Sequence, residues 1–364
     1  MTTVIDRPLL YTTIILFVGG ILIFASASIA VSQKNFGSLF YLTLRQILFG
    51  GLFGVAAFFV TQWVPYRTWK KLALPLMILS FIFLALLFIP ELGYTYGGAR
   101  RWLQIGPLSF QPSEFLKFSF VIYLASWLDA RRHDVRSFSY GLIPFALMLA
   151  IVGMFLMMQP DVGTLGVVMA TAGLMYFLGG GRKSQMTTLL VLASAIFYFI
   201  IQTAPYRLAR ILVFLNPGHD TLGIGYQINQ AFIAIGSGGF WGVGYGRGLQ
   251  KYYYLPETVG DSIFAIYAEE MGFLGAVALV GLFTFFLWRG LRIARKAPDI
   301  FGKLLAAGFS LGIMSQVFIN MAAISGLLPL TGIPLPFVSL GGTSLIMTLA
   351  SIGVILNVSK NTQA

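Results

Sequence analysis

The feature that most constrains this chain is a series of apolar runs, each close to the length needed to cross a lipid bilayer. A membrane-spanning helix takes about 20 predominantly apolar residues. Runs near that length lie at 9–30, 46–64, 72–90, 112–128, 139–158, 164–180, 185–204, 262–288, 304–325 and 342–358. We therefore expect an all-α polytopic membrane protein with about ten transmembrane helices, forming one integral-membrane domain over residues 1–364. An even number of spans places both termini on the same side.

The scarcity of charge supports the same class of protein. Of the 364 residues, 10% are charged and 57% are hydrophobic, and the mean hydropathy is +0.84. A soluble protein keeps about 25% of its residues charged, so lipid must solvate most of this surface. The first apolar run is too long for a cleavable signal peptide and lacks a small-x-small cleavage pattern, which predicts a retained helix.

The distribution of Lys and Arg predicts the orientation. With the N-terminus in the cytoplasm, every inside segment is short and carries positive charge. The inside set comprises 15 of the 24 basic residues: Arg7, Arg67, Lys70, Lys71, Arg131, Arg132, Arg136, Arg182, Lys183, Arg289, Arg292, Arg295, Lys296, Lys303 and Lys360. The positive-inside rule then places both termini in the cytoplasm. We attribute the net charge of +12 to orientation and to contact with membrane lipids, and expect no nucleic acid as a partner.

Residue types that the chain lacks exclude several chemistries. There is no cysteine, and the two histidines, His133 and His219, have no second His or Cys nearby. Disulfides and thiolate catalysis are therefore excluded, and a zinc site is not expected. The glycine-dense stretch 236–248 follows no predicted strand, so it is no dinucleotide fingerprint. Its glycines allow either close approach to a ligand or tight turns. No organic cofactor is expected.

Two segments on the predicted outer side, about 91–111 and about 205–261, are much longer than the cytoplasmic turns. The second is the loop between the seventh and eighth helices. Long ordered loops commonly carry function. We therefore expect the active site to face outward.

Both outer segments contain paired arginines. Arg100 and Arg101 precede Trp102, whereas Arg207 and Arg210 have the i, i+3 spacing of one helical face. A guanidinium can bind phosphate oxygens with two hydrogen bonds. These residues are candidates for binding a pyrophosphate head group. The alternative is contact with anionic phospholipid or with structural carboxylates.

Ionisable residues at the ends of apolar runs are further candidates, because burying them in a membrane is costly. Gln111 and Glu114 open the fourth run, with Lys117 at i, i+3 from the glutamate. They form either a structural ion pair or part of a substrate site. Asp161 lies between Pro160 and a glycine, which suggests a bend lining a polar cavity or, alternatively, a cap of the sixth helix.

A further carboxylate candidate is Asp261, which stands at the outer start of the eighth run with Glu257 one turn earlier. At that depth a carboxylate can act as a general base or a cation ligand, and the alternative is a helix N-cap. Ser339 lies in the last outer turn, 334–344, whose Pro, Gly and Ser content predicts a broken segment that contacts either a sugar or a neighbouring helix.

Taken together, these segments resemble the SEDS family of peptidoglycan polymerases, which includes FtsW, RodA and SpoVE. The amino-acid sequences of the outer segments resemble FtsW and SpoVE more than RodA. The matching motifs span nearly the whole chain: Gly98-Ala99-Arg100-Arg101-Trp102, Gln111-Pro112-Ser113-Glu114, Gln159-Pro160-Asp161-Val162-Gly163-Thr164, Ala234-Ile235-Gly236-Ser237-Gly238-Gly239, Leu255-Pro256-Glu257, Asp261, Ala268-Glu269-Glu270 with Gly272, and Pro336-Phe337-Val338-Ser339 with Gly341-Gly342.

The resemblance implies a peptidoglycan glycosyltransferase of the bacterial cytoplasmic membrane that polymerises lipid II, an undecaprenyl-pyrophosphate-linked disaccharide-pentapeptide, for cell division or elongation. The family's essential aspartate matches Asp261, which would act as base or would hold a divalent cation, Mg or Mn. The arginines would neutralise the leaving pyrophosphate. The remaining candidates would line the substrate site: Trp102, Gln111, Glu114, Lys117, Asp161, Glu257 and Ser339. The family also implies a partner, a class B penicillin-binding protein transpeptidase.

One departure from the family is that members commonly carry His-Thr before the aspartate, where this chain has Val259-Gly260. A role of that His or Thr cannot be transferred. Two other functions compete with the polymerase: a lipid II flippase, because broken helices and buried charges also suit a transporter, and a non-catalytic division scaffold.

Overall fold

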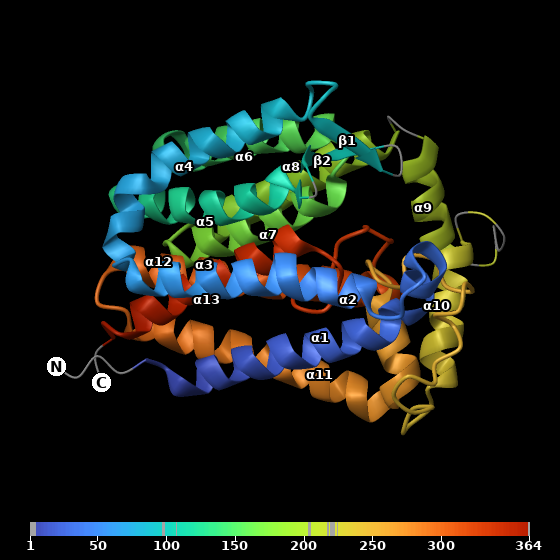
Figure 1. Ribbon diagram of the computed structural model, residues 1–364. Coiled ribbons are helices and arrows are strands. Elements are labelled where there is room, and N and C mark those ends of the chain that lie inside the picture. Colours follow the sequence, from blue (N-terminus) through green and yellow to red (C-terminus); the bar gives the residue numbers. More distant parts are fainter. Residues whose placement is uncertain are drawn as a thin grey trace.

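The chain forms a bundle of long helices, with a small sheet and two short helices gathered at one end (Figure 1). The computed structural model describes residues 5–96, 99–106, 108–202, 205–216, 218, 223 and 225–362. Gly98 of the first family motif and His219 lie outside the described residues. Both termini lie at the other end, where the Asp6 backbone N–H donates to Ser359 Oγ at 3.2 Å.

The elements follow the chain in this order: α1 (Arg7–Phe36), α2 (Tyr41–Arg45), the π-helical segment η1 (Gln46–Leu52), α3 (Phe53–Trp63), α4 (Tyr66–Leu86), β1 (Gly93–Tyr96), β2 (Ala99–Ile105), β3 (Leu108–Phe110), α5 (Pro112–Ala130), η2 (Phe138–Leu142), α6 (Ile143–Met158), α7 (Val162–Leu178), α8 (Lys183–Gln202), α9 (Pro205–Leu215), α10 (Tyr226–Ser237), α11 (Ile263–Lys296), α12 (Ile300–Ile324) and α13 (Gly342–Ser359).

Within the described residues, each of the ten predicted apolar runs lies mostly in a helix, which confirms the all-α polytopic class. By length and composition, seven helices of the described chain can cross a membrane: Arg7–Phe36, Tyr41–Trp63, Tyr66–Leu86, Phe138–Met158, Ile263–Lys296, Ile300–Ile324 and Gly342–Ser359. The shorter apolar helix α7 and the helices α5 and α8 occupy the other three runs. The chain is thus a multi-pass membrane protein. The number of spans and their sidedness stay predictions.

Local sequence explains where several helices begin and end. The Asp6 side chain caps α1 by accepting from the Leu9 N–H at 2.9 Å, and Asp299 caps α12 in the same way through Gly302. Gly37 ends α1 with a φ of 67°, a left-handed conformation that glycine adopts without steric cost. Pro112 opens α5, where its missing N–H leaves no donor unpaired.

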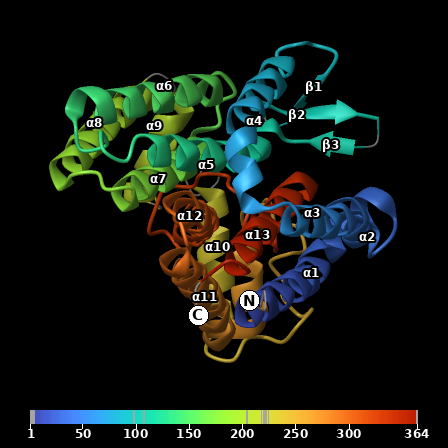
Figure 2. The same ribbon diagram turned by 90° about the vertical axis from the view of Figure 1, so that its left-hand side faces the viewer.

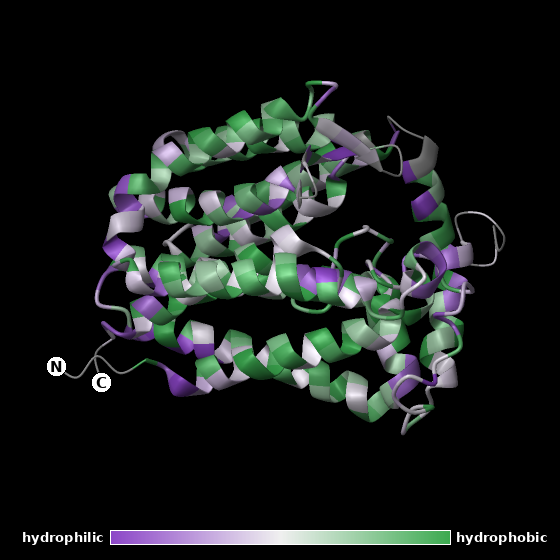
Figure 3. Cartoon of the chain, viewed as in Figure 1, coloured by the Kyte–Doolittle hydropathy of each residue, from purple (hydrophilic) through white to green (hydrophobic). Residues whose placement is uncertain are grey.

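The bundle is organised around α13 and α12. Their most apolar stretches are 83% and 67% buried, against 22–39% in the other membrane-capable helices. Viewed from the end that carries the termini, α13 lies inside the bundle beside α3 and α12 (Figure 2). Apolar residues cover the long helices, whereas polar residues gather at both ends (Figure 3). The outward side chains of the peripheral helices therefore face lipid.

The two long outer segments lie together at the end opposite the termini (Figure 1). The first contains an antiparallel sheet in the order β1-β2-β3, and the second contains α9 and α10. The sheet was not predicted, because strands of three to seven residues are too short for an alternating pattern to be recognised. Thr343 joins the sheet to α13, because its Oγ1 donates to the Ser109 carbonyl of β3 at 3.3 Å and accepts from the neighbouring Gln111 N–H at 3.2 Å.

The glycine-dense stretch packs its backbone against a kink in α11. Gly272 adopts φ 64° and ψ −166° inside that helix. A Cβ added there would lie 2.3 Å from the Gly242 nitrogen, and one added at Gly238 would lie 2.1 Å from the Ala268 carbonyl oxygen. The positive φ of Gly239, Gly242, Gly244 and Gly246 supports the tight turns considered for this stretch, and its close packing on α11 was not predicted.

Candidate active site

Asp261 stands just before α11, and α10 holds its carboxylate. Gln227 of α10 donates through Nε2 to Asp261 Oδ1 at 3.0 Å and to Ser262 Oγ at 2.9 Å. The N-cap residue of α11 is Ser262 rather than Asp261, and within the described chain this helix start has no side-chain cap. The N-cap interpretation of Asp261 is therefore wrong, because its carboxylate faces a side-chain amide of another helix instead of the first turn of α11.

The backbone around Asp261 is held by two side chains from the C-terminal third. Asn320 of α12 donates through Nδ2 to the carbonyl oxygens of Asp261, at 2.9 Å, and Ile333, at 2.7 Å. Ser339 Oγ donates to the Gly260 carbonyl at 2.6 Å and accepts from the Leu335 N–H at 2.8 Å. Ser339 was predicted, whereas Asn320 was missed. Its signal was a buried amide inside a long apolar run.

The surroundings of Asp261 raise its pKa to about 6. Burial is the largest cause, because it disfavours the charged form, and the negative charge of Glu257 is the second. The Gln227 hydrogen bond and the positive charge of Arg210 act in the opposite direction. A carboxyl with a pKa near neutrality can exchange a proton with a substrate at physiological pH.

Glu257 approaches this site through a tight turn with a φ of 51°. Its carbonyl accepts from the N–H groups of Gly260, at 2.9 Å, and Ser262, at 3.2 Å. A Cβ added at Gly260 would lie 2.9 Å from Glu257 Oε2, so the glycine leaves room for this carboxylate. The departure from the family at Val259-Gly260 therefore has a local consequence, because a Cβ at position 260 would take the space that the Glu257 carboxylate occupies. Among the described residues, no three His, Cys, Asp or Glu side chains are grouped as a metal would require.

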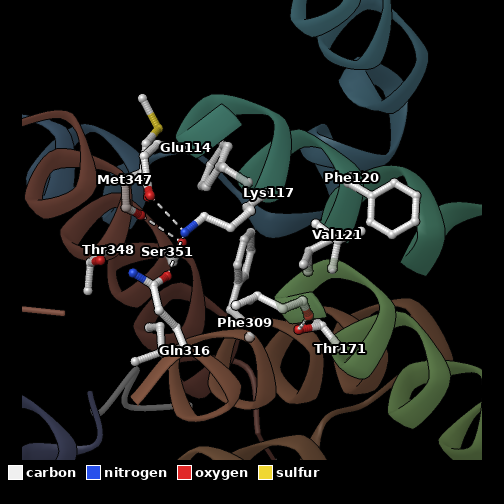
Figure 4. A pocket seen from close by; sticks show the side chains of 15 residues that line it. Glu114, Lys117, Phe120, Val121, Thr171, Phe309, Gln316, Met347, Thr348 and Ser351 are labelled. Carbon is white, nitrogen blue, oxygen red and sulfur yellow. Dashed lines mark hydrogen bonds and ion pairs between the residues drawn. The ribbon is translucent and has the colours of Figure 1, made fainter. Parts of the chain in front are cut away.

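A polar cluster opens into a pocket between α5, α7, α12 and α13 (Figure 4). Lys117 Nζ lies 2.8 Å from Glu114 Oε1 and 2.5 Å from Gln316 Oε1. The predicted Glu114–Lys117 ion pair is thus present. The pocket has about 500 Å³ of empty space, including its open side. Thr171 and Ser351 add hydroxyl groups to an otherwise largely apolar lining.

Gln316 connects this pocket to the Asp261 site, because its Nε2 donates to the Pro334 carbonyl at 2.9 Å. Gln316 and Asn320 are one turn apart on α12, so their amides project from the same face. Both bind the irregular segment between α12 and α13. The predicted broken segment is irregular over 334–341, whereas residues 342–344 belong to α13. The two amides pair the Ile333 and Pro334 carbonyls at its start.

Arg101 holds the bend between α6 and α7 by donating to the carbonyl oxygens of Gln159, at 3.4 Å, and Pro160. Asp161 Oδ1 accepts from the Thr164 N–H at 3.2 Å, which confirms the predicted cap of α7. In the described part of the chain, Asp161 Oδ2 and both side-chain polar atoms of Gln159 are buried without a hydrogen-bond partner. These three buried atoms at the bend between α6 and α7 can therefore still form hydrogen bonds.

The other predicted residues are more dispersed. Arg210 donates to the Leu330 carbonyl at 3.1 Å and acts on Asp261 through its charge. Arg207 is partly buried one turn earlier on the same helix. Arg100 is exposed on β2 and donates to Thr95 Oγ1 at 3.3 Å. Trp102 is paired with Tyr94 across the sheet, and Gln111 donates to Ser113 Oγ at 3.1 Å.

Sequence reasoning missed a buried ion pair beneath the glycine-dense stretch. Lys251 Nζ lies 2.6 Å from Glu270 Oε1 and donates to Ser26 Oγ at 3.0 Å and to the Gly246 carbonyl at 2.9 Å. The Lys251 side chain is 0% exposed. The neighbouring Glu269 accepts from the Leu249 N–H at 2.8 Å. These contacts fix the stretch on α1 and α11, so Glu269 and Glu270 have structural roles here.

Comparison of the sequence with models of protein families identifies the family of this chain. The sequence model of the family FtsW/RodA/SpoVE, described as "Cell cycle protein", matches residues 7–364. The chain belongs to this family. The resemblance inferred from its motifs is thereby confirmed over the length of the protein.

Similar proteins and solved structures support the same family. The chain is 40% identical to stage V sporulation protein E of Bacillus subtilis (strain 168), covering 98% of this chain and 97% of the relative. It is 38% identical to a probable peptidoglycan glycosyltransferase FtsW of Geobacter sp. (strain M18), covering 97% and 96%. It superposes on RodA of Thermus thermophilus with a TM-score of 0.72, 28% identity and coverage of 99% and 98%. A chain of a solved peptidoglycan synthase complex gives a TM-score of 0.81, 29% identity and coverage of 99% and 98%.

The buried ion pair yields the first prediction. Lys251→Met leaves the Glu270 carboxylate buried without its cation and should destabilise the fold by about 3–5 kcal/mol. Thermal unfolding in detergent, followed by tryptophan fluorescence, measures the change. The matched control is Lys34→Met, because Lys34 is exposed and lies over the Tyr253 ring at 4.5 Å, a contact expected to contribute about 1 kcal/mol or less.

The double variant Lys251→Met/Glu270→Met removes both charges and should recover most of the lost stability. Equal unfolding temperatures for Lys251→Met and Lys34→Met would show that the buried pair contributes nothing specific.

Proposed function

We propose that this protein is a peptidoglycan glycosyltransferase that polymerises lipid II on the outer face of the bacterial cytoplasmic membrane. The observation that carries the proposal is Asp261, a carboxylate with a raised pKa that is hydrogen-bonded to Gln227 of α10. Helix α10 lies at the end of the bundle opposite the termini (Figure 1). Family membership and the relatives named as probable peptidoglycan glycosyltransferases support the reaction class.

In this proposal Asp261 acts as the general base. It removes the proton from a sugar hydroxyl of the acceptor, and the resulting oxygen attacks the anomeric carbon of the donor. The bond from that carbon to the lipid pyrophosphate breaks, so one glycosidic bond forms with inversion. Gln227 orients the carboxylate through its 3.0 Å hydrogen bond. Arg210 is placed to stabilise charge on the departing pyrophosphate, with Arg207 beside it.

A divalent cation, Mg or Mn, fits this site only as an ion shared with the substrate. Asp261 and Glu257 are the two carboxylates that would hold it. Mg²⁺ commonly binds to one or two carboxylates together with substrate phosphates. When bound, such an ion supplies positive charge to the pyrophosphate. The described residues provide no third acidic or histidine ligand, so a cage made of protein ligands alone does not fit.

The remaining parts of the proposal concern orientation and partner. The positive-inside distribution favours cytoplasmic termini. These lie opposite α10, whose Gln227 binds Asp261, so the site would face outward. Glu114, Lys117, Asp161 and Ser339 would shape the adjoining polar cavity. A class B penicillin-binding protein is the proposed partner. The similarity to a chain of a peptidoglycan synthase complex supports assembly with such a protein.

Polymerisation of purified lipid II in the presence of the partner transpeptidase tests the proposal. Asp261→Asn keeps the size of the side chain and removes the base, so glycan synthesis should fall at least about 100-fold. Asp134→Asn is the control, because Asp134 is exposed near the end that carries the termini. Unfolding temperature checks that both variants remain folded.

Equal strand formation by wild type and Asp261→Asn would show that Asp261 is structural. Failure of the wild type beside an active control polymerase would favour the flippase or the scaffold, and movement of labelled lipid II across vesicles separates those two.

The pH dependence of the rate gives a separate prediction. A base with a pKa of about 6 must be deprotonated, so polymerisation should rise with pH and reach half its plateau near pH 6 rather than near the ordinary 3.8. Glu257→Gln removes a negative charge that raises this pKa, so the half-maximum should move to lower pH. Glu91→Gln, at an exposed turn, is the control. A half-maximum unchanged in Glu257→Gln would contradict the coupling.

A further inference from the structure

A second pocket lies between α9, α10 and the chain that follows α12. Its lining residue Ile228 directly follows Gln227, which donates to Asp261 Oδ1 at 3.0 Å. The pocket contains about 360 Å³ of empty space, including its open side. Val213 of α9 and Ile228 of α10 contribute buried walls, and Phe232 contributes an aromatic one. Apart from Arg210, the described lining residues are apolar, glycine or proline. The pocket is therefore suited to a hydrocarbon chain and offers no hydroxyl or amide side chain for a sugar.

A glycine shapes one wall of this pocket. Gly326 has a φ of 75°, and a Cβ added there would lie 2.5 Å from Phe232 Cζ. Only glycine lets the chain turn against the ring without strain. The wall is thus fixed by close packing of α10 on the end of α12.

Arg210 belongs both to this pocket and to the surroundings of Asp261. Its guanidinium is anchored to the Leu330 carbonyl at 3.1 Å, and its charge acts on the Asp261 carboxylate. A ligand whose anionic head binds Arg210 therefore lies next to Asp261, while the pocket can receive the hydrocarbon attached to that head. Charge at one end and apolar walls beyond it match a prenyl pyrophosphate.

The position of α9 gives such a chain access from the membrane. The helix lies across the direction of the long spans, at the end opposite the termini (Figure 1). Leu208, Leu212 and Leu215 form an exposed apolar stripe, and Leu215 is 71% exposed. Helices with this pattern lie in the membrane interface with the apolar stripe in lipid. The pocket behind α9 is consequently at the level where head groups meet hydrocarbon.

We propose that this pocket binds the isoprene units next to the pyrophosphate of the donor substrate, with Arg210 at the pyrophosphate. The proposal rests on the function proposed above and adds a site for the lipid part of the substrate. The pocket holds the beginning of a long prenyl chain and leaves the rest in the bilayer.

Steady-state polymerisation of lipid II and of an analogue that lacks the prenyl chain tests the proposal. Val213→Phe and Ile228→Phe fill the pocket from two different helices, and Leu215→Phe adds the same ring on the exposed side of α9. The two filling variants should lower kcat/KM for the long-chain substrate by about tenfold or more, because apolar burial is lost. An analogue whose pyrophosphate carries a methyl group in place of the prenyl chain should change less than about twofold, because it puts no isoprene unit into the pocket. Leu215→Phe should match the wild type with both substrates.

A parallel loss with both substrates, or no loss with either, would overturn the proposal, since the pocket would then be only structural. If the wild type polymerises neither substrate, the proposed function fails. The pocket is then judged by a second measurement, crosslinking of a prenyl pyrophosphate with a photoreactive first isoprene unit. Crosslinks should map to α9, α10 or residues 326–330 and be displaced by undecaprenyl pyrophosphate. Displacement by phosphatidylglycerol alone would identify a general lipid site and contradict the proposal.

Discussion

The structure depends on one constraint, which is that backbone carbonyls exposed by a broken segment inside a membrane bundle must still be hydrogen-bonded. The chain between α12 and α13 is such a segment. Gln316 and Asn320 supply hydrogen bonds to this segment by donating to the Pro334 and Ile333 carbonyls, respectively. Asn320 uses the same amide to hold the Asp261 carbonyl. One face of α12 therefore fixes both the irregular segment between α12 and α13 and Asp261, which lies just before α11.

That arrangement determines the chemistry available at Asp261. Its carboxylate bonds to a neutral amide of α10, and the nearby charges of Glu257 and Arg210 act on its pKa in opposite directions. A close cationic partner would have kept the group ionised and weakly basic. Burial and the negative charge of Glu257 instead raise its pKa to about 6, although the Gln227 hydrogen bond and the charge of Arg210 act in the opposite direction. The site thus combines a fixed position with a proton affinity useful for base catalysis.

Much of the fold could be predicted from the sequence, because a run of about 20 apolar residues has few alternatives to a spanning helix. The cap at Asp161 and the Glu114–Lys117 pair were also predictable, since both depend on residues three apart. The roles of Asn320 and Lys251 were not. Asn320 acts on a carbonyl 59 positions away, and Lys251 resembled other basic residues of the outer segment until packing showed its burial.

The interpretation of Asp261 as an N-cap failed for a related reason. Caps are assigned from local spacing, whereas the partner of this carboxylate is Gln227, 34 residues away on another helix. The sheet and the pocket behind α9 also arise from elements that are short or adjacent only in space. Predictions from sequence were therefore reliable for local interactions and incomplete for long-range polar ones.

The central claim is that the amide of Asn320 holds Asp261 in its reactive position. The most direct measurement is lipid II polymerisation by Asn320→Leu, a substitution of similar size that removes both donated hydrogen bonds, with Phe318→Leu as control on the exposed side of the same helix. The account predicts a fall in kcat of at least about tenfold in a protein that retains its helical content. Polymerisation at the wild-type rate by Asn320→Leu would contradict it.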